Sequence, residues 1–261
     1  SSDVCSSDLL SRAGITGPRE ILEGEWGLLR VYSEDHSRKS LDTGVAVLMD
    51  GLGQRFLGDE LSLKAFPCCK ATHTGIEATL QLIEDHDLAE AEIEAVKVDL
   101  SQRSFQTVGH PFRIRANPQV DAQFSMAYCV AAAIQRRSIS LRDFTLEAIQ
   151  DEHRKSLTER VTVAIEPSFK DASSNVVNLT SRVRIKARGA VFEKTCKTAR
   201  GHYQTPLSRA TLMDKFQGCL DFSPLSPADG GQKILDTLWN LDSLADVGHL
   251  TSLFIPDDGR E

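Results

Sequence analysis

Residues 61–87 read LSLKAFPCCKATHTGIEATLQLIEDHD and place a helix directly after a proline-containing turn. Pro67 interrupts regular structure because proline has no backbone N–H to donate. Thr74 and Glu77 have the spacing of a capping box, in which each side chain satisfies a free backbone group at the helix start. Apolar side chains then recur at spacings of four and three residues, at Ile76, Leu80 and Ile83. The stretch therefore predicts a helix that begins at Thr74 and buries one apolar stripe.

Strands and further helices follow this segment. Residues 92–100 and 160–166 alternate apolar and polar side chains, which is typical of strands with one buried face. Residues 182–187 and 191–196 alternate in the same way around Gly189, and this pattern predicts a β-hairpin. Helical patterns cover residues 119–134, 141–150, 207–219 and 232–244. This order of elements predicts an α+β domain attached to helical segments.

The chain before residue 61 is less regular. The first nine residues, SSDVCSSDL, have no helical or strand period and resemble a translated sequencing adapter. We expect the protein proper to begin near Leu10, in a gene that was cut before its true start. Gly17-Pro18 suits a helix entry, because proline at the first helical position loses no hydrogen bond. Helices are predicted at about residues 18–31 and 43–56.

Composition excludes several classes of protein. The 261 residues are 41% hydrophobic and 26% charged with a net charge of −7, so neither disorder nor attraction to nucleic acid or an anionic membrane is expected. The longest uncharged stretch, between Asp121 and Arg136, is too short to span a bilayer. Six cysteines without a CxxC pair, two of them adjacent at Cys68 and Cys69, indicate reduced thiols and a cytoplasmic protein.

Lys64, Lys70 and His73 flank the turn at Pro67. The free N–H groups and the dipole at a helix N-terminus favour an anion there, and two ammonium groups strengthen the attraction. A carboxylate is the ligand that we expect, and histidine is the side chain whose ordinary pKa near neutrality suits proton transfer. The plainer alternative is that the lysines are solvated and His73 only supports the turn.

Three other groups of residues have a functional and a plain interpretation. Cys68, Cys69 and His73 could ligate a metal, but adjacent cysteines rarely converge on one ion, so we expect buried thiols and no metal. Asp121, Ser125 and Tyr128 have helical spacing, and Tyr128 could donate a proton, although such a tyrosine is more often a core aromatic. Residues 182–200 carry seven basic side chains against one acid, which suits either nucleic acid or, more plausibly, a solvated sheet face.

Four pieces of the chain resemble the later part of the MmgE/PrpD family, and they occur in the family's order. The most specific of them is the K-x-F-P-C-C-x-x-T-H segment that runs from Lys64 to His73. The pieces are GITGPREILEGEWGLL (residues 14–29), LSLKAFPCCKATHTGIEATLQL (61–82), NPQVDAQFSMAYCVAAAI (117–134) and GHYQTPLSRATLMDKFQGC (201–219). The family includes 2-methylcitrate dehydratase, cis-aconitate decarboxylase and iminodisuccinate epimerase.

The resemblance implies a subunit with a large all-helical domain and a small α+β domain that holds a mixed or antiparallel sheet. Residues 10–60 would end the helical domain, residues 61–220 would form the α+β domain, and residues 221–261 would return to the helical domain. It further implies a homodimer at full length and no required metal or organic cofactor. We expect a C-terminal fragment that is inactive alone, since the family's active site lies between the domains.

The resemblance also implies which residues act. Lys64, His73 and Tyr128 match family positions near the active site, and Lys64 and Lys70 would bind carboxylates of a di- or tricarboxylic acid. His73 would move a proton at the carbon next to a carboxylate, and Tyr128 would assist the leaving hydroxyl or the opposite face. A 2-methylcitrate dehydratase-like hydro-lyase is the first expectation. The alternatives are a decarboxylase or epimerase of the family, or a non-catalytic module for carboxylate binding or dimerisation.

Overall fold

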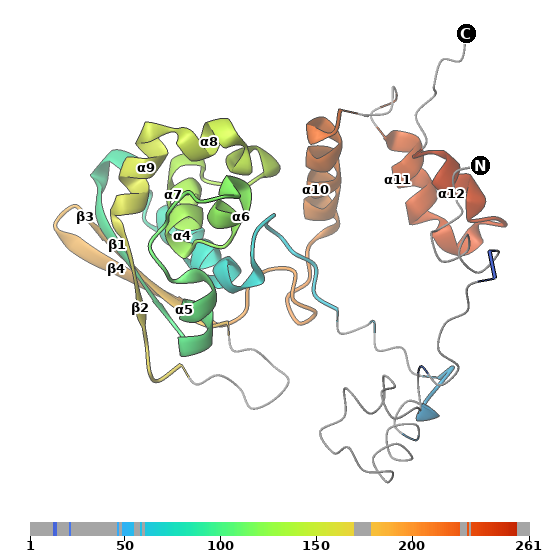
Figure 1. The fold of residues 1–261 in the computed structure, drawn as a ribbon, viewed down its shortest axis with the longest axis horizontal. Coiled ribbons are helices and arrows are strands. Elements are labelled where there is room, and N and C mark those ends of the chain that lie inside the picture. The colour runs from blue at the N-terminus through green and yellow to red at the C-terminus, as the bar shows by residue number, and fades with distance from the viewer. Residues whose placement is uncertain are drawn as a thin grey trace. The chain divides into compact units, whose positions relative to one another are not determined.

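The computed structural model describes residues 61–169, 179–224 and 231–254, together with residues 13–14, 21, 46, 49–54, 58 and 229 (Figure 1). The chain divides into two compact units, residues 1–60 and 61–261. The helices predicted at residues 18–31 and 43–56 fall almost entirely outside the described residues of the first unit. The second unit contains the elements discussed below.

A mixed sheet of four strands forms the centre of the second unit. The strands are β1 (Ile93–Leu100), β2 (Val161–Ile165), β3 (Ser181–Ala187) and β4 (Ala190–Cys196). Their order across the sheet is β2-β1-β3-β4, with β1 parallel to β2 and the other two pairs antiparallel. The connection between the parallel strands is long and helical, as a parallel pair requires. The α+β class with a mixed sheet is therefore confirmed.

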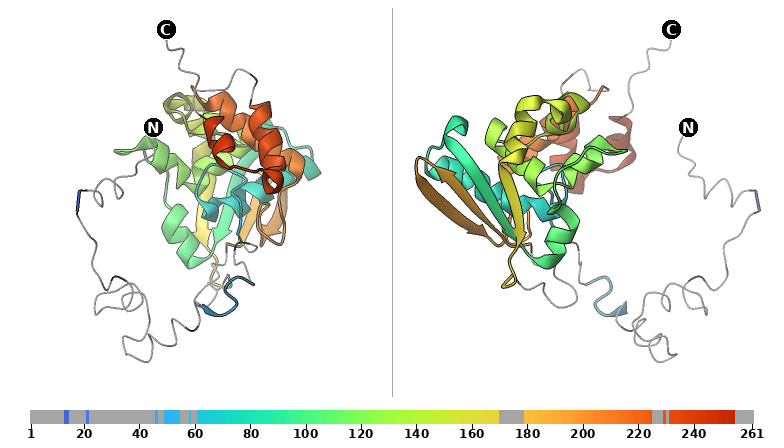
Figure 2. Two further views of the ribbon diagram at one scale, coloured as in Figure 1. Left: turned by 90° about the vertical axis from the view of Figure 1, so that its right-hand side faces the viewer. Right: turned by 60° about the vertical axis from the view of Figure 1, so that its left-hand side comes forward.

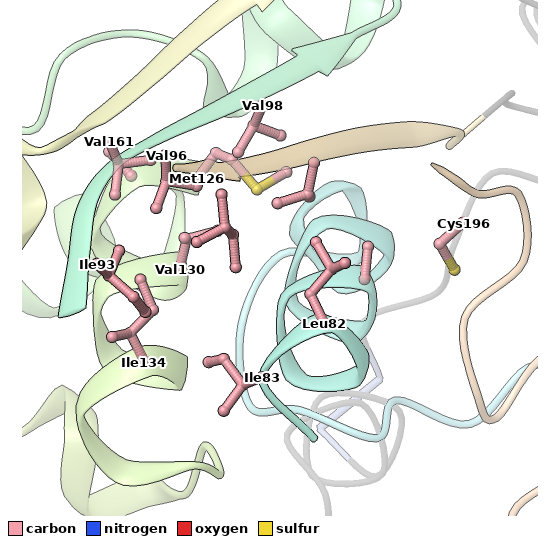
Figure 3. Close-up of a cluster of buried hydrophobic side chains, with 14 of the residues drawn as sticks. Leu82, Ile83, Ile93, Val96, Val98, Met126, Val130, Ile134, Val161 and Cys196 are labelled. Carbon is pink, nitrogen blue, oxygen red and sulfur yellow. The ribbon is translucent and has the colours of Figure 1, made fainter. Parts of the chain in front are cut away.

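Helices α4 (His73–Asp85) and α7 (Met126–Arg136) pack against one face of the sheet (Figures 1 and 2). Alternation along the strands directs one row of apolar side chains toward these helices. Figure 3 shows this core, whose labelled members are Leu82, Ile83, Ile93, Val96, Val98, Met126, Val130, Ile134, Val161 and Cys196. A second apolar cluster around Phe66, Ile76 and Tyr128 joins the turn before α4 to α7.

The β-hairpin is confirmed at the predicted position. Strands β3 and β4 are joined by Arg188 and Gly189, whose φ angles are 54° and 70°. Two consecutive positive φ values are the signature of the type I′ turn, whose twist matches that of the flanking strands. Gly189 adopts this conformation at no steric cost, whereas Arg188 is an uncommon left-handed non-glycine residue.

The start of α4 differs from the prediction. A short 3-10 turn (Lys70–Thr72) leads into α4, which begins at His73 with Thr72 as its N-cap and no side-chain cap. Thr74 instead hydrogen bonds to Leu179 O and to Ser181 Oγ, 2.8 Å away, and so ties the helix to β3. The predicted capping box is wrong, because tertiary partners occupy the Thr74 hydroxyl and the Glu77 carboxylate.

The predicted helix over residues 119–134 is two helices. α6 (Pro118–Gln123) ends at Phe124, and Ser125 caps α7 by accepting a hydrogen bond from Tyr128 N at 3.2 Å. Serine favours this position because its hydroxyl satisfies a free N–H group at a helix start. Asp121 pairs with Arg115 at 2.8 Å instead of sharing a helical face with Ser125 and Tyr128. The predicted shared face is therefore wrong.

The remaining helices around the sheet are short. Residues 141–150 form a 3-10 turn (Leu141–Phe144) and then α8 (Leu146–Gln150), because Thr145 caps a new helix there. α5 (Gln102–Val108) and α9 (Glu152–Glu159) were not predicted. Toward the C-terminus lie α10 (Arg209–Phe222), α11 (Gln232–Trp239), a 3-10 turn (Leu241–Ser243) and α12 (Gly248–Ser252). None of the helices in the described ranges is both long and apolar enough to cross a bilayer.

The sheet face opposite α4 and α7 is charged. Asp99 of β1 is almost fully buried there, and it accepts hydrogen bonds from Arg182 at 3.1 Å and Arg184 at 2.5 Å. Six of the seven basic residues between positions 182 and 200 pair with carboxylates, namely Arg182, Arg184, Lys186, Arg188, Lys194 and Arg200. Most of this basic character is thus neutralised within the domain.

Candidate functional site

The turn at Pro67 is fixed by the break between α6 and α7. Gln123 donates from Nε2 to Pro67 O at 3.0 Å, and Cys69 N donates back to Gln123 O at 3.0 Å. The two hydrogen bonds join segments more than fifty residues apart in sequence. They hold the turn, and with it the start of α4, in one position against α7.

Lys64 and Lys70 lie on either side of this turn, and both are exposed. Neither ammonium group pairs with a carboxylate among the described residues, whereas Lys97, Lys155, Lys186 and Lys194 all do. Positive charge near the α4 N-terminus is therefore available to an external anion. Both lysines precede α4: Lys64 lies before the turn at Pro67, and Lys70 is in the 3-10 turn that leads into the helix.

His73 is the first residue of α4 and is buried, with only 3% of its surface exposed. Its ring meets Phe66 edge-on, with the ring centroids 5.2 Å apart. Within the described residues, His73 Nε2 is the only fully buried side-chain nitrogen or oxygen without a hydrogen-bond partner. Such a group costs free energy unless a ligand or an ordered water satisfies it, which makes His73 Nε2 a candidate contact for a bound molecule.

The cysteines beside His73 form a thiol cluster. Cys68 Sγ lies 3.1 Å from Thr72 Oγ1, and both residues are buried. Hydrogen bonding with Cys129 and the neighbouring His73 lower the pKa of Cys68 to about 5, although burial opposes this. Burial raises the pKa of Cys129. No three histidine, cysteine or acidic side chains converge as metal ligands anywhere in the described ranges.

The structure also brings residues 199–205 beside this turn. Leu63 N donates to Gly201 O at 2.7 Å, and the loop is closed by Gly201 N donating to Thr205 O at 2.8 Å. Arg200 pairs with Glu77 at 2.9 Å, one helical turn after His73. The sequence reasoning did not select Arg200 or Glu77. The sequence placed Glu77 in a predicted capping box and Arg200 in the basic stretch of residues 182–200, and no local pattern connected the two.

Gly201 provides a test of this close approach. Its φ is +88°, and a Cβ atom there would lie 2.1 Å from Leu63 O. We expect Gly201→Ala to lower the free energy of unfolding by at least about 2 kcal/mol, because both the backbone conformation and the contact become unfavourable. Chemical denaturation measures the change. Gly218→Ala in α10, where the Cβ meets open space, should instead stabilise by up to about 1 kcal/mol.

Tyr128 is placed differently from His73 and the lysines. It is fully buried, and its hydroxyl donates to Asp143 O at 2.5 Å and accepts from Arg154 at 3.3 Å. Arg154 also pairs with Asp143 Oδ1 at 3.0 Å. Asp143 and Arg154 line a cavity of about 340 Å³ to which Lys64, Lys70 and His73 do not contribute. The structure therefore assigns the Tyr128 hydroxyl to this buried network.

The network makes the Tyr128 phenol a weak acid. Burial raises its pKa to about 12, and Arg154 opposes the shift only in part. At about pH 11 an ordinary phenol is roughly 90% ionised, whereas a phenol with this pKa is only about 10% ionised. We expect the phenolate absorption of folded wild type and of Tyr128→Phe to be almost equal at that pH. A full phenolate band assigned to Tyr128 would show that the hydroxyl is not held in this way.

Comparison with known proteins places these residues in a family. The sequence profile of the MmgE/PrpD C-terminal domain matches residues 66–241. Cis-aconitate decarboxylase of Homo sapiens is 25% identical over 248 residues, which cover 94% of this chain and 49% of that protein. Cis-aconitate decarboxylase of Mus musculus is 23% identical over 253 residues, 94% of this chain and 48% of that protein. The chain thus spans about half the length of the curated relatives that it matches.

The matched region begins within the turn at Phe66 and includes His73, the whole sheet and α10. It therefore covers the segments on which the sequence resemblance was based, apart from the first piece and the residues before Phe66. The chain belongs to the MmgE/PrpD family, and residues 66–241 are its C-terminal domain.

Proposed function

We propose that this domain serves a lyase that moves a proton at the carbon next to a carboxylate of a di- or tricarboxylic acid. The observation that carries the proposal is the unpartnered, buried Nε2 of His73 at the start of α4, which follows two exposed lysines without carboxylate partners in the described ranges. Family membership and the two decarboxylase relatives support the substrate class.

The chemistry assigned to each residue follows from its charge and burial. Lys64 and Lys70 bind substrate carboxylates, and their positive charge stabilises the negative charge that builds up when the neighbouring carbon loses its proton. One such preorganised donor can stabilise a transition state by about 3 kcal/mol. His73 accepts that proton or returns it, since an imidazole can do either near neutral pH.

Dehydration and decarboxylation both fit this arrangement, and so does the epimerisation that the family includes. In 2-methylcitrate dehydration, the base removes a proton and the hydroxyl of the neighbouring carbon leaves as water, forming a double bond. In cis-aconitate decarboxylation, a carbon–carbon bond breaks, CO2 leaves, and the electron pair left behind, which is shared with the neighbouring double bond, takes up a proton. The names of the two curated relatives favour the second reaction, and the dehydratase remains our first assignment from the wider family.

The test supplies each acid in deuterated water and follows products by proton NMR. Dehydration gives an alkene with the same number of carbons, and decarboxylation gives a shorter acid that carries solvent deuterium. Both the 261-residue chain and any longer protein that its gene encodes are assayed. Binding without turnover or deuterium exchange would favour a non-catalytic carboxylate-binding module. Failure of both proteins to bind or convert any of the acids would overturn the proposal.

A further inference from the structure

We infer that Arg200 binds a second carboxylate of the substrate and makes the site selective for acids with more than one carboxylate. The inference rests on the proposed function, because it adds a residue to the same site. Arg200 lies in the loop that is hydrogen bonded to residue 63, next to Lys64. It also contacts Phe66, the residue against which His73 packs.

A backbone hydrogen bond next to Arg200 fixes the position of its main chain relative to Lys64. The hydrogen bond between Leu63 N and Gly201 O holds the two segments together, and Gly201 has no space for a side chain. Residues 64 and 200 therefore extend from adjoining, rigidly paired backbone. This placement gives the site one cation from each of two segments that are far apart in sequence.

The guanidinium group is oriented by two contacts. Its Cζ atom lies 5.4 Å from the Phe66 ring centroid, and its Nε donates to Glu77 Oε2 at 2.9 Å. Glu77 is itself nearly buried, and Gln81 donates to its other oxygen at 3.1 Å. Because the carboxylate is fixed from both sides, it holds the Arg200 side chain in one orientation, as supporting contacts do in preorganised sites.

The terminal nitrogens of Arg200 distinguish it from the arginines of the β3–β4 hairpin. Arg182, Arg184 and Arg188 each use both Nε and a terminal nitrogen in contacts with carboxylates. Arg200 uses only Nε, and its two terminal nitrogens donate to no acceptor among the described residues. The side chain is 45% exposed.

An arginine with free terminal nitrogens suits a carboxylate ligand, because its planar fork can form charge-assisted hydrogen bonds with carboxylate oxygens. A purely structural pair with Glu77 would not need this exposed end. The ligand class is a di- or tricarboxylate, one carboxylate of which meets Lys64 while another meets Arg200.

The test measures the affinity of the full 261-residue chain for citrate, succinate and acetate by calorimetry or NMR titration. Arg200→Gln should weaken citrate binding about tenfold or more, since one charge-assisted contact is lost, and should reduce the preference for citrate over acetate. Arg200→Lys keeps the positive charge but loses the planar guanidinium group. Its citrate affinity should therefore lie between those of wild type and Arg200→Gln. The unfolding midpoint of each variant shows whether the domain is intact.

Arg188→Gln is the matched control, because it removes the same charge from an arginine at the hairpin turn. We expect its citrate affinity to equal that of wild type. Equal citrate binding by wild type and Arg200→Gln would overturn the inference and leave the proposed function standing. An equal loss of citrate affinity in Arg188→Gln would also overturn the inference, because the effect would then come from the change in net charge and not from a contact at Arg200. A wild-type chain that binds none of the acids would overturn the inference as well.

Discussion

Replacing Arg154 with methionine should lower the free energy of unfolding by about 3–5 kcal/mol, the largest stability effect that we expect in this domain. The Arg154 and Asp143 side chains are only 4% and 5% exposed, and they are 3.0 Å apart. Methionine would fill much of the same volume but would leave the Asp143 carboxylate buried without its cation. Urea denaturation followed by circular dichroism measures the loss.

The expected size of this effect follows from how many elements meet at Arg154. From α9 its guanidinium contacts Gln135 on α7, Asp143 in the 3-10 turn before α8, and the Tyr128 hydroxyl. Asp143 has a second role, because its Oδ2 accepts from Ser140 N at 2.8 Å and so caps that turn. Removal of the arginine therefore leaves several buried polar groups without a partner, each with a desolvation cost.

Two controls separate the buried charge from other causes. Lys155→Met removes the adjacent cation of α9, whose partner Glu152 is 86% exposed, and should change stability by less than about 0.5 kcal/mol. Adding Asp143→Asn to Arg154→Met keeps the cap but removes the unpaired charge, so it should restore part of the lost stability. If Arg154→Met lowers the free energy of unfolding no more than Lys155→Met does, the buried Arg154–Asp143 pair does not stabilise the domain.

Local sequence patterns were sufficient to predict the strands and the main helices of the domain, whereas α5 and α9 were missed. The hairpin was predictable because alternation has a period of two and Gly189 marks the turn. The apolar face of α4 was predictable in part from helical spacing: Ile76 and Ile83 are buried, Leu80 is only partly buried, and Leu82 also lies in the core. Both patterns depend on neighbours within one element, which is why a single sequence is enough to find them.

Contacts between distant segments could not be predicted in the same way. The break at Ser125 depends on a single capping side chain inside an otherwise helical pattern, and it is reinforced by hydrogen bonds to the turn at Pro67. Thr74 and Glu77 matched a local motif, but their partners Ser181 and Arg200 come from more than a hundred residues away. For the same reason, Lys64 and His73 were identified as a candidate pair while the adjoining Arg200 was not.

His73→Phe should reduce turnover by about a hundredfold or more, measured in whichever form of the protein converts the acid, because the proton-transfer group is lost. Phenylalanine keeps a ring of similar size against Phe66, and it removes the buried Nε2 that has no partner among the described residues. The free energy of unfolding should therefore stay within about 1.5 kcal/mol of wild type, as for other volume-conserving core changes.

The combination of the two measurements identifies the role of His73. A large loss of turnover with stability retained is expected for a proton-transfer group, whereas a loss of both would indicate a structural histidine. His153→Phe is the matched control: His153 lies on α9 with its side chain 56% exposed, so turnover should not change. Unchanged turnover in His73→Phe would remove His73 from the reaction and leave the lysines as the basis of a carboxylate-binding site alone.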